Sequence, residues 1–203
     1  MLNACFSSIN QLPVTDQKRR TAGENELLLQ LWQRSQDGDS VAFRDLADRL
    51  YRSMFNYAYN FTRDRDFIKD TIQELLIAIW VKRRRIRMEF VSLYFLRSLR
   101  NQLIQEFRRS GNSRVFFDVD DFGHLSDYHT IEGALVEEEI LADHLYKVRS
   151  AIEDLPRRQR EAVFLKYYEG VDNEKIAEIM QINRQSVANL LFRALTALKA
   201  QIV

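Results

Sequence analysis

Long stretches without glycine or proline are the feature that most constrains how this chain can fold. Residues 39–110 contain neither residue type, and neither do residues 171–203. Both residue types disfavour the interior of a helix, so their absence over these stretches favours long helices. The chain of 203 residues has only two prolines and six glycines in total. This scarcity argues against a turn-rich all-β fold.

The spacing of apolar residues predicts helices in the same stretches. Steps of three, four and seven residues place side chains on one face of a helix. Four such stripes occur: Phe43, Leu46, Leu50, Met54, Tyr57 and Phe61; Ile68, Ile72, Leu75, Leu76 and Ile79; Leu93, Leu96, Leu103 and Phe107; and Leu141, Leu145, Val148, Ile152 and Leu155. Arg97 and Arg100 interrupt the third stripe. We expect Asp66 to cap the helix that carries the second stripe.

Charge is distributed in blocks, although the net charge is only +1. Residues 82–114 carry ten Lys or Arg and two Asp or Glu, whereas residues 115–143 carry nine acids and no Lys or Arg. A basic block indicates a polyanion-binding segment, and the acidic block beside it is typical of a linker or a decoy. We predict an all-α chain with an irregular tail at 1–24, a helical domain at 25–110, an acidic linker at 111–137 and a second helical domain at 138–203.

Signals for export, membrane insertion and catalysis are missing from the sequence. No apolar run approaches the ~18 residues of a membrane-spanning helix, and no basic-then-apolar signal pattern occurs at the N-terminus. The single cysteine, Cys5, excludes a disulfide framework, and His124, His129 and His144 lack metal-ligand spacing. We therefore expect a cytoplasmic protein that is not an enzyme and needs no cofactor, metal or small-molecule substrate.

Helix boundary signals after residue 155 predict a helix-turn-helix. We expect Pro156 to separate two helices and Gly170 to end the second of them. Asp172 is placed to cap a short helix and Asn183 a longer last helix, with Gln181 in the turn where glycine is more usual. An ordinary antiparallel pair of helices explains the periodicity about equally well.

The second helix of a helix-turn-helix enters the major groove of DNA, where its first residues reach base edges. Arg, Gln and Asn side chains have donors that match purine edges, and Ser contacts a base or a phosphate. The candidate contacts are Arg184, Gln185, Ser186, Ala188, Asn189 and Arg193.

The basic run Lys82–Arg87 precedes a segment in which aromatic and basic side chains are interleaved. Cations neutralise phosphates, and each base that stacks on an aromatic ring gains ~1–3 kcal/mol, so the combination is typical of single-strand binding. We expect at least one of Phe90 and Phe95 to be a core residue instead. The candidate contacts are Arg85, Arg87, Phe90, Tyr94, Arg97 and Arg100.

Two parts of the chain resemble the extracytoplasmic-function group of bacterial RNA polymerase sigma factors. Residues 155–164, Leu-Pro-Arg-Arg-Gln-Arg-Glu-Ala-Val-Phe, resemble the opening of the fourth conserved region, as do residues 168–170, 176–179 and 189–194 after them. Residues 70–76, Asp-Thr-Ile-Gln-Glu-Leu-Leu, and residues 90–101 resemble parts of the second conserved region. Gln181 and Ala188 depart from the family's usual glycine and basic residue.

The resemblance implies a role for each segment. The polymerase-binding helix would contact the clamp of the largest polymerase subunit through Asp70, Gln73, Glu74 and Leu76, although such polar faces are usually only solvated. The segment that opens the minus-ten promoter element would include Asn101 beside Arg100, with a base-capturing loop at 85–90. The last helix would recognise the minus-thirty-five element.

We therefore predict an alternative sigma factor that binds core RNA polymerase and directs promoter-specific initiation on promoter DNA. The resemblance also implies an anti-sigma partner, which in this family is often anchored in the inner membrane. Two alternatives remain at this point. A plain helix-turn-helix regulator would bind duplex DNA tightly without polymerase, and a helical interaction protein would bind no DNA.

Overall fold

The computed structural model describes residues 14–109, 147, 148 and 150–202, and every regular element in them is helical. The first part contains α2 (Val14–Gln36), α3 (Ser40–Tyr59), α4 (Arg65–Lys82), the short 3-10 helix η1 (Arg83–Arg85) and α5 (Val91–Arg109). The second part contains α8 (Arg157–Val163), the π-helical turn η2 (Phe164–Tyr168), α9 (Asn173–Met180) and α10 (Arg184–Ile202). The predicted all-α class is confirmed.

Some sequence predictions fall outside the described residues. These are the acidic linker at 111–137, the three histidines, Cys5 and part of the fourth apolar stripe. The irregular tail expected over residues 1–24 is wrong in part, because α2 begins at Val14. Leu28, Leu31 and Trp32 bury the C-terminal half of α2 in the core, and a helix anchored in this way extends outward at little cost.

Side-chain caps begin four of the helices. Asp172 accepts a hydrogen bond from the Lys175 N–H at 2.9 Å, and Asn183 accepts one from the Ser186 N–H at 2.7 Å, as predicted. The cap of α4 is Asp64 and not Asp66, which lies in the first turn. The two carboxylates are two residues apart, and only the extended backbone of Asp64 (φ −70°, ψ 99°) places its side chain on the free N–H groups.

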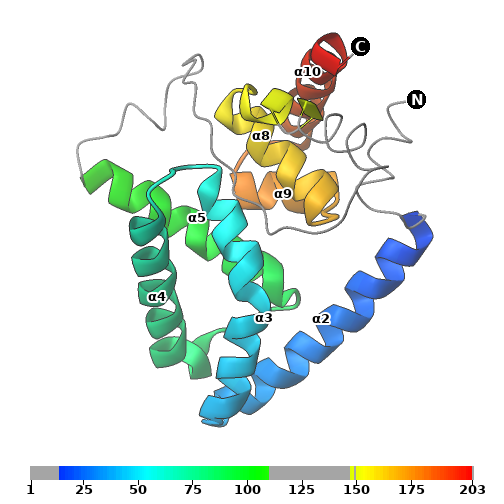
Figure 1. Cartoon of the computed structure of the whole chain (residues 1–203). Coiled ribbons are helices and arrows are strands. Elements are labelled where there is room, and N and C mark those ends of the chain that lie inside the picture. The colour runs from blue at the N-terminus through cyan, green and yellow to red at the C-terminus, as the bar shows by residue number, and fades with distance from the viewer. Residues whose placement is uncertain (1–13, 110–146, 149, 203) are drawn as a thin grey trace, which may run out of the picture.

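One continuous hydrophobic core joins the two parts of the chain. Figure 1 shows α8, α9 and α10 gathered on one side of the N-terminal helices, and α9 packs on α5. The third apolar stripe is incomplete, because it leaves out Phe95 and Leu99, which are fully buried. Arg100, which interrupts that stripe, is buried as well. The largest side chains of the shared core include Tyr57, Phe95, Leu46, Met54, Leu165 and Ile176.

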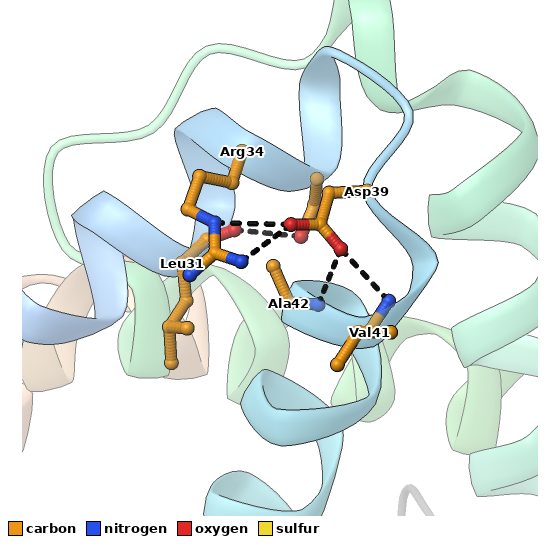
Figure 2. Close-up of polar contacts among 6 residues, drawn as sticks. Leu31, Arg34, Asp39, Val41 and Ala42 are labelled. Atoms are coloured by element: carbon orange, nitrogen blue, oxygen red, sulfur yellow. Dashed lines mark hydrogen bonds and ion pairs between the residues drawn. The ribbon is translucent and has the colours of Figure 1, made fainter.

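Asp39 fixes the sharp turn between α2 and α3 (Figure 2). One carboxylate oxygen accepts hydrogen bonds from the Val41 and Ala42 N–H groups, both at 3.0 Å. The other oxygen binds the Arg34 guanidinium, with Nη2 at 2.6 Å. The Ala42 N–H and the Arg34 side chain hold the pKa of Asp39 below its usual value. A lowered folded-state pKa gives stability above the unfolded pKa and loses it as the pH falls through the folded pKa.

We expect Asp39→Asn to lower the thermal midpoint at pH 7, because the amide keeps a capping oxygen but loses the charge that Arg34 binds. The difference from the wild type should shrink as the pH falls below about 4, the unfolded-state pKa of an aspartate, and vanish once the carboxyl of the folded protein is protonated as well. Thermal unfolding followed by circular dichroism across this pH range measures the difference in thermal midpoint between the two proteins. A difference that does not depend on pH would contradict the proposed charge effect.

Candidate nucleic-acid and polymerase-binding surfaces

Two polar residues of α2 hold the basic segment between α4 and α5 in place. Gln36 Nε2 donates hydrogen bonds to the carbonyls of Arg83 (3.0 Å) and Ile86 (2.9 Å). Asn25 Nδ2 donates to the Glu89 carbonyl (2.9 Å), and Asn25 Oδ1 accepts from the Val91 N–H (3.1 Å). Sequence reasoning missed both residues, because they lie 47 to 66 positions from the groups they bind and carry no local motif.

The predicted basic contacts in this segment are exposed. Arg85 and Arg87 both lie in solvent. Arg84 and Arg87 also line a polar hollow of about 580 Å³, together with Gln33, Gln36 and Asp37 of α2 and the turn after it. Arg83 differs from its neighbours, because its guanidinium lies 4.0 Å from the Trp80 ring centroid and donates to the Trp80 carbonyl. Exposed guanidinium groups of this kind can neutralise phosphates.

The aromatic and basic candidates of α5 divide into exposed and buried groups. Phe90 is 41% exposed, just before the helix, and Arg97 and Asn101 are exposed on it. Tyr94 is half-buried. Phe95 is 0% exposed, so one of the two phenylalanines is a core residue, as expected. The exposed members form a surface with both cations and an aromatic ring, the two components that a single strand requires.

Arg100 is not available to nucleic acid in this structure. Its side chain is 7% exposed, and Nε donates to Glu161 Oε1 of α8 at 2.8 Å. The same oxygen accepts a 2.6 Å hydrogen bond from the Tyr57 hydroxyl of α3. Burial, reinforced by the Glu161 charge, raises the pKa of Tyr57 well above its usual value. Burial also lowers the pKa of Arg157, beside this cluster, to about 10, although the charge of Glu161 opposes that change.

The helix-turn-helix predicted from the boundary signals is present as α9, a turn and α10. Gln181 ends α9 in the left-handed conformation (φ 55°) that usually favours glycine. The Ile182 N–H then returns to the Ala177 carbonyl at 3.0 Å, which closes the turn. The inner face of α10 is buried through Val187, Leu191, Ala194 and Leu198. The opposite face is therefore free to carry the predicted contacts.

The predicted recognition residues extend from the start of α10 to about two and a half turns along it. Arg184, Gln185, Asn189 and Arg193 are exposed, and Ser186 and Ala188 are half-buried. Arg184 pairs with Glu174 of α9 at 3.0 Å, and Gln185 donates to Asn189 at 3.2 Å. Phe192 is 72% exposed on the same helix, and the sequence reasoning did not select it.

The exposed face of α4 extends beyond the predicted polar residues and includes apolar side chains. Asp70, Gln73 and Glu74 are exposed, and Glu74 accepts a hydrogen bond from Gln102 of α5 at 3.1 Å. Leu76 is half-buried and packs against the core, so it offers less surface than expected. Ile77 and Val81 continue the face and are 56% and 71% exposed. Steps of seven and four residues join Asp70, Ile77 and Val81, and this spacing was the signal that could have found them.

The described residues contain no helix long and apolar enough to cross a membrane. They also contain no group of three His, Cys, Asp or Glu side chains that is arranged to hold a metal ion.

Comparisons with known proteins match both parts of the chain to one family. Residues 46–113 match the family described as sigma-70 region 2, and residues 145–198 match sigma-70, region 4. The RNA polymerase sigma-H factor of Pseudomonas aeruginosa is 29% identical over 180 residues, which cover 83% of this chain and 90% of that protein. The ECF RNA polymerase sigma-E factor of Haemophilus influenzae is 29% identical over 174 residues, which cover 81% and 89%.

Solved structures show the same fold. The sigma factor RpoE of Bartonella quintana, solved with the anti-sigma factor NepR, has a TM-score of 0.59 at 20% identity and covers 79% of this chain and 96% of its own. CnrH, solved with the cytosolic domain of CnrY, has a TM-score of 0.55 at 17% identity and covers 84% and 93%.

A helix-turn-helix whose second helix has one exposed polar face, together with an exposed surface of basic and aromatic side chains, is the combination expected of a protein that acts on DNA. The two matched regions are numbered parts of one family, and together they cover 122 of the chain's 203 residues. The chain belongs to the sigma-70 family of RNA polymerase sigma factors, in the extracytoplasmic-function group. It is an alternative sigma factor that directs transcription initiation, and this decides against the two alternatives left open by the sequence.

Proposed function

We propose that three separate surfaces of this sigma factor have different binding roles in transcription initiation. The start of α10 reads the minus-thirty-five element, the segment from Arg85 to Asn101 binds the melted minus-ten strand, and the exposed face of α4 binds core RNA polymerase. The observation that carries the proposal is the exposure of twelve of the fifteen polar and aromatic candidates; Tyr94 and Ser186 are half-buried and Arg100 is buried. The domain ranges 25–110 and 138–203 and the linker at 111–137 remain part of this proposal.

Recognition of the minus-thirty-five element rests on four exposed side chains and on a helix end. Arg184, Gln185, Asn189 and Arg193 present donors in the geometry that purine edges require. The N–H groups at the start of α10 add a site for a backbone phosphate, which positions the helix without reading sequence. Ser186 and Ala188 are half-buried and would contribute close packing against the groove.

Melting of the minus-ten element rests on binding energy and not on bond chemistry. Unstacking a base costs a few kcal/mol, and an aromatic platform with nearby cations offsets that cost. Phe90, Tyr94 and Arg97 supply these groups, and Arg85 and Arg87 supply phosphate contacts at the preceding loop. Arg100 and Asn101 would join them once Arg100 is released from Glu161. We infer accordingly that the chain is not an enzyme.

Polymerase binding rests on a mixed acidic and apolar face. Asp70, Gln73 and Glu74 form its polar end, and Ile77 and Val81 extend it with side chains that are exposed although apolar. Exposed apolar groups beside charged ones are typical of a protein-binding surface. We include Ile77 and Val81 in the proposed surface for this reason, next to Leu76.

The polymerase surface is tested by capture of purified core RNA polymerase on the tagged full-length chain. We expect the wild type to retain polymerase, and Asp70→Ala/Gln73→Ala and Ile77→Asp to weaken binding about tenfold or more, since an Ile side chain that loses its apolar contact forfeits ~1.5–3 kcal/mol. Asp48→Ala, at an exposed carboxylate of α3, is the control and should bind like the wild type. A wild type that retains no polymerase would overturn the proposal.

Partners and location follow from the same proposal. The Bartonella relative was solved with an anti-sigma factor, which supports an anti-sigma partner for this chain. The family resemblance adds that such partners are often anchored in the inner membrane. Because polymerase and promoter DNA are the other partners, we propose that the chain acts in the cytoplasm.

A further inference from the structure

Gln36 of α2 uses both hydrogens of its amide group on the backbone of the basic segment. Its Nε2 donates to the Arg83 carbonyl at 3.0 Å and to the Ile86 carbonyl at 2.9 Å. A glutamine amide has two N–H donors, so neither donor remains for a base or a phosphate. Gln36 is half-buried, and it fixes the start of the segment that carries the exposed Arg85 and Arg87.

Asn25 of α2 holds the other end of this segment through both sides of its amide. Its Nδ2 donates to the Glu89 carbonyl at 2.9 Å, and its Oδ1 accepts from the Val91 N–H at 3.1 Å. Val91 is the first residue of α5, where the N–H has no acceptor within its own helix. Phe90 lies between the two groups that Asn25 binds, so Asn25 fixes the backbone on either side of that aromatic residue.

The two amides are spaced so that one rigid helix supports both ends of the segment. Asn25 and Gln36 are about three turns apart on α2, so they lie on the same face of the helix, ~16 Å apart along its axis. Leu28, Leu31 and Trp32 lie between them in the sequence and are buried in the core, which anchors α2 independently of the two amides. Along one edge of the N-terminal helices, α2 contacts both η1 and α5 (Figure 1).

The loop between the two supports has little hydrogen bonding of its own. Residues 86–90 form no helix, and among their N–H groups only that of Ile86 has a backbone acceptor, the Arg83 carbonyl at 3.4 Å. Ile86 and Met88 are half-buried and pack against the core, but apolar contacts have no preferred direction. Hydrogen bonds are directional, so the two amides of α2 fix the backbone path of the loop and the position of Phe90.

We propose that Asn25 and Gln36 are positioning residues that set the base preference at the minus-ten element. This inference rests on the proposed function of the segment from Arg85 to Asn101. Neither residue contacts DNA in this scheme, and each acts through the loop whose backbone it binds. Both lie before residue 46, where the match to sigma-70 region 2 begins, so that match assigns no role to them.

A fixed loop matters more for base preference than for affinity. Attraction between a guanidinium group and a phosphate changes slowly with distance, so phosphate contacts tolerate a shift of the loop and carry no sequence information. Contacts with a base edge are directional, and a correct contact gives a roughly 5- to 150-fold preference over the wrong base. A loop released from α2 keeps its cations but loses this preference.

The test selects promoter DNA with the holoenzyme, from a library in which the minus-ten and minus-thirty-five positions are both randomised. Sequencing of the bound DNA gives the base preference at each position. We expect Asn25→Ala/Gln36→Ala to lower the preference at minus-ten positions by about tenfold, and to leave the preference at minus-thirty-five positions unchanged. Gln30→Ala removes an exposed amide from the same helix, between the two supports, and should behave like the wild type.

Amide hydrogen exchange of the free chain tests the loop directly. We expect exchange at residues 86–91 to become several-fold faster in Asn25→Ala/Gln36→Ala, because the Val91 N–H loses its acceptor and the loop loses its supports. Exchange in α3 and α4 should match the wild type. Unchanged exchange at residues 86–91 would overturn the inference.

Phe90→Ala separates failure of the inference from failure of the proposed function. If Phe90→Ala changes the minus-ten preference and Asn25→Ala/Gln36→Ala does not, the inference is wrong and the proposed strand-binding role stands. If neither variant changes that preference, the proposed role of the segment fails, and the inference fails with it. An equal loss of preference at both promoter elements would indicate general destabilisation and would also overturn the inference.

Gln36→Met keeps the experiment decisive if the double variant does not fold. Methionine has nearly the same length and shape as glutamine but no N–H donor, so it removes the two hydrogen bonds without leaving a cavity. We expect Gln36→Met to show the same selective loss of minus-ten preference, about threefold or more. A wild-type preference in a folded Gln36→Met holoenzyme would overturn the role of Gln36.

Discussion

Phe95→Ala is expected to lower the free energy of unfolding by about 3–5 kcal/mol, the range measured for truncation of a buried phenylalanine. Phe95 is 0% exposed in α5 and belongs to the core that joins both parts of the chain. Natural domains are stable by only ~5–15 kcal/mol, so this loss would leave a marginal protein. Urea unfolding followed by circular dichroism gives the value. A midpoint equal to that of the wild type would show that Phe95 is not a core residue.

Phe90→Ala is the matched comparison, because it removes the same side chain five positions earlier. Phe90 is 41% exposed, so its loss should change stability by no more than ~1 kcal/mol, the contribution of its exposed contact with Lys175. Strand binding should weaken by ~1–3 kcal/mol, the contribution of one stacked base. Formation of open promoter complexes by the holoenzyme measures the second effect. Unchanged open-complex formation would remove Phe90 from the proposed strand-binding surface.

Arg184→Ala is expected to reduce initiation by the holoenzyme roughly 5- to 150-fold on a promoter that needs its upstream element. The factor corresponds to ~1–3 kcal/mol for one specific arginine–base contact. Arg184 is exposed at the first position of α10, and its guanidinium pairs with Glu174 at the surface. In vitro transcription with saturating core polymerase provides the measurement. Normal initiation by both Arg184→Ala and Arg193→Ala would overturn the assignment of α10.

Glu174→Gln is the control for this variant. The Arg184–Glu174 pair is about 70% exposed on both sides, and a surface pair of this kind contributes no more than ~1 kcal/mol. Releasing Arg184 from Glu174 should leave initiation unchanged or raise it a few-fold. A large loss in Glu174→Gln would mean that the ion pair orients Arg184, and that the effect of Arg184→Ala includes a structural part.

The sequence alone determined the class, the helices and the helix-turn-helix. Local signals carry this information, because each depends on neighbours within one or two turns. Stretches without glycine or proline predicted the helices, and Asp172 and Asn183 predicted two helix starts that the structure confirms. The same local reasoning placed the cap of α4 at Asp66 and not at Asp64, because two carboxylates two residues apart cannot be distinguished without the backbone angles.

Only the tertiary structure decided which members of each candidate set face solvent. Phe90 and Phe95 are alike in the sequence, and only packing buries one of them and leaves the other exposed. The sequence predicts Arg100 as a nucleic-acid contact. The structure shows that it is buried in an ion pair with Glu161, which also accepts a hydrogen bond from Tyr57. Asn25 and Gln36 bind backbone groups of the segment between α4 and α5, and no local sequence pattern predicts these contacts. The physical reason is the same in each case: burial and long-range pairing depend on residues that are distant in sequence and meet only after folding.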